Sequence, residues 1–81
     1  MMSMRLYKTE VGDMVVSTVK LPWPLPEGFA YSGRAMWYET MIFGGKRNGY
    51  TRRCETEEEA MKQHEYVVSY ARQIIKGQYH G

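Results

Sequence analysis

The chain has 81 residues, of which 43% are hydrophobic and 25% charged, and its formal net charge at pH 7 is +2. A chain this short buries only roughly 60% of its unfolded surface, so we expect one domain over residues 1–81 with one small core. The net charge is too small to imply a nucleic-acid partner by itself. The single cysteine, Cys54, excludes an internal disulfide and has no companions at zinc-ligand spacing.

No stretch of the sequence approaches the ~20 apolar residues of a membrane span, and residues 1–10 are polar. We therefore expect a protein of the reducing cytoplasm, with no membrane contact, no metal and no cofactor. Residues 1–4 and 78–81 are expected to be flexible.

The first half of the chain predicts a hairpin followed by a long loop. Alternating residues over 5–11, a Gly12-Asp13 turn and a β-branched run over 14–21 indicate two antiparallel strands. Prolines on alternate positions then favour a loop over residues 21–33, because proline lacks a backbone donor. Its aromatic residues either anchor the loop or form a recognition surface; they are Trp23, Phe29 and Tyr31.

Residues 36–45 contain the longest apolar run and predict a central strand that ends at two glycines. Alternation gives this strand two faces, and neither face is polar. Glu39 lies on the face with Trp37 and Met41, which we expect to meet the helix. The other face needs a cover, for which the 21–33 loop, a second copy and a partner protein are the candidates; it carries Met36, Tyr38, Thr40 and Ile42.

The last half of the chain predicts a glycine-rich hairpin loop over 44–49, a short strand over 50–54 and a helix. Thr56 and Glu59 have the spacing of a capping box, and Gly77 is a natural C-terminal stop. A stripe at helical spacing marks the buried side of the helix; it consists of Ala60, Met61, His64, Val67, Val68, Ala71, Ile74 and Ile75. The predicted fold is α+β, with a four-stranded, mostly antiparallel sheet in the order 1-2-3-4 and this helix packed on one face.

Three segments together resemble a group of small uncharacterised proteins of bacteria and their phages. The segments cover about half the chain and are Val16-Ser17-Thr18-Val19, Tyr38-Glu39-Thr40-Met41-Ile42-Phe43-Gly44-Gly45, and the helix start from Thr56 through Glu59-Ala60 to His64 and Val67-Val68. Between Lys20 and Ala35 the group carries an Asp-His type loop, where this chain has Pro22-Trp23-Pro24. The resemblance implies a phage or prophage context and brings no established activity.

Two sets of polar residues are candidates for chemistry. Glu39 and His64 form an acid/base dyad, half of a metal site or, as we favour, a structural polar pair buried between sheet and helix. A basic hairpin is either a solvated loop or a phosphate and base site; it consists of Lys46, Arg47, Tyr50, Arg52 and Arg53.

We therefore expect a non-enzymatic phage-type accessory protein that binds and inhibits or modulates a host protein, and that forms a homo-oligomer. The partner-binding surface is predicted to comprise Trp23, Phe29, Tyr31, Met36, Tyr38 and Ile42. The alternatives are a nucleotide or nucleic-acid binder that uses the basic hairpin, such as a sponge for a signalling nucleotide, and a small enzyme that uses Glu39 and His64.

Overall fold

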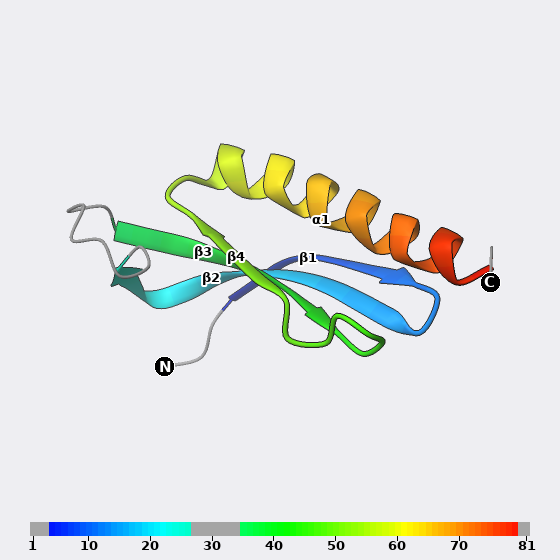
Figure 1. Ribbon diagram of the computed structural model, residues 1–81. Coiled ribbons are helices and arrows are strands. Elements are labelled where there is room, and N and C mark those ends of the chain that lie inside the picture. Colours follow the sequence, from blue (N-terminus) through cyan, green and yellow to red (C-terminus); the bar gives the residue numbers. More distant parts are fainter. Residues whose placement is uncertain (1–3, 27–34, 80–81) are drawn as a thin grey trace.

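The structure is a computed structural model that describes residues 4–26 and 35–79 (Figure 1). Four strands form one antiparallel sheet in the order β1-β2-β3-β4, and one long helix lies along one face of it. The elements are β1 (Met4–Val11), β2 (Met14–Pro26), β3 (Ala35–Phe43), β4 (Thr51–Cys54) and α1 (Glu57–Tyr79). The predicted α+β fold, with one C-terminal helix and strand order 1-2-3-4, is confirmed.

Short glycine-containing turns set the register of the sheet. Val11 pairs with Met14 across the Gly12-Asp13 turn, where Gly12 has a φ of 61°. In the β3–β4 loop, Gly44 and Gly49 also have positive φ. The amide of Gly49 donates to the carbonyl of Ile42 at 2.8 Å, which closes this second hairpin. Glycine reaches this backbone region without the steric cost that a Cβ brings.

The prediction of a loop over residues 21–33 is wrong for residues 21–26, because β2 continues to Pro26. Pairing with β3 breaks off after Lys20, opposite Tyr38, and resumes at Leu25, opposite Met36. The prolines at 22 and 24 fall inside this irregular stretch, where no ladder bond requires their missing N–H. Phe29 and Tyr31 lie outside the described residues.

Helix α1 begins at the predicted capping box. The Thr56 amide donates to Glu59 Oε1 at 3.2 Å, and the Glu59 amide donates to Thr56 Oγ1 at 3.1 Å. The expected stop at Gly77 is wrong, since the helix continues to Tyr79 and Gly77 is not among the glycines of positive φ. At the other end of the chain, Met4 already belongs to β1.

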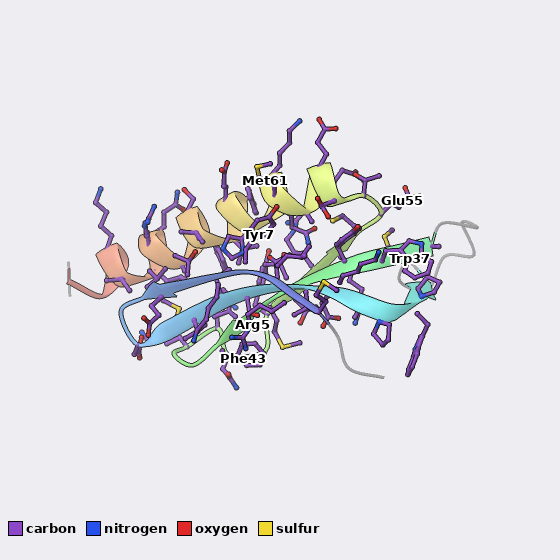
Figure 2. The ribbon with its side chains drawn as sticks, turned by 180° about the vertical axis from the view of Figure 1, so that it is seen from behind. Arg5, Tyr7, Trp37, Phe43, Glu55 and Met61 are labelled. Carbon is purple, nitrogen blue, oxygen red and sulfur yellow. The ribbon has the colours of Figure 1, made fainter. Side chains whose placement is uncertain are left out.

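The core lies between α1 and the sheet. Its buried apolar side chains come from all four strands and from the helix; they are Val11, Met14, Val16, Met36, Tyr38, Ile42, Cys54, Ala60, Val67, Val68 and Ala71. Met61 is 48% exposed and projects from the helix away from the sheet, so its place in the predicted buried stripe is wrong (Figure 2).

Candidate functional site: the open face of the sheet

Helix α1 covers one face of β3. This is the face for which a loop, a second copy or a partner protein was expected as the cover. Met36, Tyr38, Thr40 and Ile42 are all buried under α1, and Thr40 and Ile42 have no exposed surface. Their predicted role in partner binding is therefore wrong for Met36, Tyr38 and Ile42. In the part of the chain that the structure describes, the uncovered face of the sheet is the one that carries Glu39 (Figure 1).

A row of hydrogen-bonded polar side chains crosses the covered face. His64 Nδ1 lies 2.7 Å from Thr18 Oγ1, and His64 Nε2 lies 2.9 Å from Thr9 Oγ1. Thr18 Oγ1 also bonds Thr40 Oγ1 at 2.7 Å. Gln63 Nε2 donates to Thr40 Oγ1 and to the Arg52 carbonyl, both at 3.1 Å. We call Thr9, Thr18, Thr40, Gln63 and His64 the polar row; it connects α1 to all four strands.

The predicted pair of Glu39 and His64 does not form, because the two side chains lie on opposite faces of the sheet. Burial lowers the pKa of His64, and the charge of Glu65 offsets this only in part. The imidazole is therefore neutral at pH 7, with both ring nitrogens bonded to threonine hydroxyls. The Tyr7 ring of β1 lies 5.5 Å from the imidazole, on the side of the sheet that α1 covers (Figure 2).

Glu39 instead pairs with its cross-strand neighbour on the uncovered face. Arg53 Nε donates to Glu39 Oε2 at 2.9 Å, and the two residues lie opposite each other in the β3–β4 register. The side chain of Glu39 is only 16% exposed. A carboxylate under α1 would have required a buried cation, whereas here a neighbouring guanidinium and water both stabilise it.

The register arranges the uncovered face in three cross-strand rows, which we call the open face. The first row contains Arg5, Val19, Glu39 and Arg53. The second row contains Lys8, Ser17, Met41 and Thr51, and the third contains Glu10, Val15 and Phe43. In these rows, the two central strands therefore carry apolar side chains, Ser17 and the charged Glu39, whereas the outer strands carry four charged side chains and Thr51.

The most accessible apolar groups of the open face are aromatic. Phe43 is 50% exposed and Trp37, one step beyond the first row on β3, is 37% exposed. Phe43 and Arg5 both project from the sheet on the side away from α1 (Figure 2). Trp23, a predicted partner-binding residue, is 59% exposed in the irregular part of β2. The open face is thus an apolar surface with a charged border.

The residues of the predicted basic hairpin do not form one site. Arg52 and Arg53 are successive residues of β4, and their side chains point to opposite faces. Arg53 pairs with Glu39, whereas the Arg52 guanidinium lies 4.9 Å from the centre of the Tyr66 ring on α1. Arg52 also donates to the Tyr50 hydroxyl at 3.4 Å. The two remaining cations, Lys46 and Arg47, are exposed in the loop between β3 and β4.

A shallow cavity of about 360 Å³ lies between β4 and the first turns of α1. Its lining is rich in cations and includes one carboxylate; the residues are Met36, Arg52, Arg53, Cys54, Glu59, Lys62 and Gln63. Cys54 is buried, and burial raises the pKa of its thiol, with a further contribution from Glu59. A thiol in that state is a poor nucleophile at neutral pH.

The sequence interpretation missed Phe43, Trp37 and Arg5 as surface residues. One signal was available for the first two, since they share the strand face of Glu39 and an unpaired carboxylate is rarely buried. Among the residues described by the structure, no three His, Cys, Asp or Glu side chains gather to hold a metal ion. In the same residues, no helix has the length and apolarity needed to cross a membrane.

Comparisons with family models, curated proteins and solved structures found no match to this chain.

Proposed function

We propose that this chain is a non-enzymatic accessory protein, of the phage or prophage type, that binds and modulates a host protein. The open face is the binding surface in this proposal. One observation carries it: the central strands present apolar and aromatic side chains to solvent, with Phe43 50% exposed, on a face that no described element covers.

The composition of the open face is typical of a protein–protein interface. Aromatic residues and methionine are enriched in the centres of such interfaces, and charged residues are concentrated at their borders. Phe43, Trp37 and Met41 have the central character, whereas Arg5 and Glu10 have the border character. A small monomer rarely exposes such a patch without a use for it.

The polar row supports a binding role over a catalytic one. A general base must reach the proton that it abstracts, but both ring nitrogens of His64 are already bonded to threonine hydroxyls beneath the helix. Glu39, the other candidate, is on the opposite face and pairs with Arg53. The role we assign to the polar row is to fix the register of the sheet against α1.

The test places a photo-crosslinking amino acid at position 43 or at position 66 in bacterial cells. Tyr66 is a matched control, because it is 56% exposed but lies on α1, away from the open face. We expect position 43 to give an adduct with a specific host protein and position 66 to give none. The captured protein is then purified, and its affinity is measured for the parent chain and for Phe43→Ser and Tyr66→Ser.

Support requires that Phe43→Ser weakens the binding of the purified partner at least about tenfold, a loss typical of a central aromatic contact. Tyr66→Ser should leave the affinity within about twofold of the parent chain. Equal losses in both variants, or adducts of position 43 that contain only copies of this chain, would overturn the proposal.

A second candidate function, binding of a nucleotide or other phosphate compound, is favoured by the cavity between β4 and α1. The charged side chains that face α1 among its lining residues are two cations and one carboxylate, namely Arg52, Lys62 and Glu59. Titration calorimetry with inorganic phosphate, mono- and dinucleotides and a short RNA would test this function. Binding that is lost in Lys62→Ala would support it, whereas no heat with any of these ligands would exclude it.

A further inference from the structure

We infer that the open face associates with the open face of a second copy of this chain, in a two-fold arrangement that sets Arg5 of each chain against Glu10 of the other. The inference rests on the proposed function in that both use the same face. The inference adds that the free protein is a dimer. A host protein must therefore displace the second copy in order to bind the open face.

The size of the open face suits a second sheet. Strands lie ~4.8 Å apart and rise ~3.3 Å per residue. The eight residues of β1, the regularly paired Met14–Lys20 of β2, the nine residues of β3 and the four of β4 therefore cover about 440 Å² per chain, against about 800 Å² per partner in an interface of standard size. We therefore expect a dimer that dissociates in the micromolar range.

Two sheets that pack face to face keep their strands within about 30° of each other, which allows two kinds of two-fold axis. If the axis runs parallel to the strands, β1 lies over β4 of the second copy. Arg5 then meets Arg53 in the same row, which is repulsive, and Val19 covers the carboxylate of Glu39. The contact between the two guanidinium groups disfavours this arrangement.

The axis can instead run along the second row, perpendicular to the strands. The first row of one chain then lies over the third row of the second copy. The register places Arg5 opposite Val19 and Glu10 opposite Val15, so both charges lie two rows apart on β1 and equally far from the axis. Each chain then sets its Arg5 against the other chain's Glu10, and its Val19 against the other chain's Val15. On β3, the same operation sets Glu39 against Phe43 of the other chain.

The residues on this axis are compatible with close approach. Ser17 and Met41 of the second row meet their own copies, and both are uncharged. The two copies of Lys8 also face each other on this axis, and their long, flexible side chains separate the two ammonium groups in water. The Arg5–Glu10 contacts on β1 and the Val19–Val15 contacts on β2 thus come from a single symmetry operation.

Association through the sheet edges is less suitable than association through the open face. β4 has only four residues, which offers few backbone groups for pairing with another strand. β1 has an irregular register between Arg5 and Tyr7 and carries exposed charged residues. Short, bulged and charged edge strands discourage edge-to-edge pairing.

The experiment measures the mass of the purified 9.5 kDa chain by analytical ultracentrifugation from about 1 to 300 µM, a range that spans micromolar dissociation. We expect a monomer–dimer equilibrium that Phe43→Ser weakens at least about tenfold and Tyr66→Ser leaves unchanged. Arg5→Glu and Glu10→Arg, each alone, place two like-charge contacts in the dimer and should also weaken it about tenfold. Lys8→Ala, the charge control, should not weaken it.

The decisive measurement is a mixture of the Arg5→Glu and Glu10→Arg chains. In the mixed dimer both contacts again join a carboxylate to a guanidinium, so its affinity should return to within about threefold of the parent dimer. All these substitutions are at exposed positions, and far-UV circular dichroism checks that each variant is folded.

A monomer at 300 µM, a mixture no tighter than its components, or a dimer that Arg5→Glu strengthens would overturn the inference. The last result is the one expected from the disfavoured axis. A monomer whose position 43 binds a host protein would overturn the inference and leave the proposed function standing. A dimer that obeys the charge exchange, in cells where position 43 captures only this chain, would support the inference and overturn the proposed function.

Discussion

Replacement of Thr18 by valine should destabilise the fold more than any other change of a single hydroxyl in the polar row. Thr18 has no exposed surface, and its hydroxyl bonds both His64 Nδ1 and Thr40 Oγ1 at 2.7 Å. Valine has nearly the same shape, so the substitution creates no cavity. It removes two buried hydrogen bonds and leaves His64 Nδ1 without a partner.

The magnitude follows from these contacts. Each lost hydrogen bond costs about 0.5–1.5 kcal/mol, and a buried polar group left unsatisfied costs about 1–3 kcal/mol. Thr40 keeps its bond from Gln63, so the main penalty is at His64. We expect a loss of about 2–3 kcal/mol, which is a large part of the roughly 4–12 kcal/mol expected for a domain of this size.

Urea unfolding followed by tryptophan fluorescence and circular dichroism measures the effect. The midpoint should fall while the slope of the free energy against urea concentration is unchanged, because the substitution alters stability and not the surface exposed on unfolding. Thr9→Val removes only the bond to His64 Nε2, from a half-buried residue, and should cost about 1 kcal/mol.

A double-mutant cycle isolates the contact. In a His64→Leu background the imidazole is gone, so Thr18→Val should cost at least about 1 kcal/mol less than in the parent chain. An equal cost in both backgrounds, or a cost below about 0.5 kcal/mol in the parent chain, would refute the claim that the polar row stabilises the fold.

Three further predictions concern the same core and the turns. Burial lowers the pKa of His64 from the ordinary 6.5, so the unfolded chain takes up a proton first as the pH falls. The contribution of His64 to the free energy of unfolding should be complete above pH 6.5 and should decline by up to about 1.4 kcal/mol per pH unit below it. The free energy of unfolding of His64→Leu, measured by urea titrations at pH 7.5 to 5.5, should lack this slope. Gly44→Ala should cost at least about 1 kcal/mol more than Gly49→Ala. Both glycines have positive φ, but a Cβ at 44 would lie 2.4 Å from the Asp13 carbonyl oxygen and a Cβ at 49 meets nothing within 4 Å; equal urea midpoints would contradict this. Gly77→Ala, in a helical turn with open space around it, should raise the thermal midpoint by stabilising α1 by up to about 1 kcal/mol, and a lower midpoint would show that Gly77 is needed at that place.

Local patterns were sufficient for most of the fold. The Gly12-Asp13 turn, the glycines around 44–49 and the Thr56–Glu59 capping box act over a few residues, and the structure has each of them where the sequence predicts it. Strand order followed because successive hairpins place consecutive strands side by side. The error at residues 21–26 has a local cause as well. Alternate prolines favour a loop, but an irregular stretch of β2 beside β3 accommodates them.

Alternation along residues 36–43 already requires that β3 has two largely apolar faces and that the stripe of α1 covers one of them. Which face it covers was decided by tertiary contacts. His64 needed two uncharged partners for its ring nitrogens, and the hydroxyls of Thr9 and Thr18 provide them on the face opposite Glu39. Glu39 needed a cation and water, and Arg53 provides the cation across the β3–β4 pair. Alternation assigns residues to two faces, but only the partners brought by other strands and by the helix decide which face is buried.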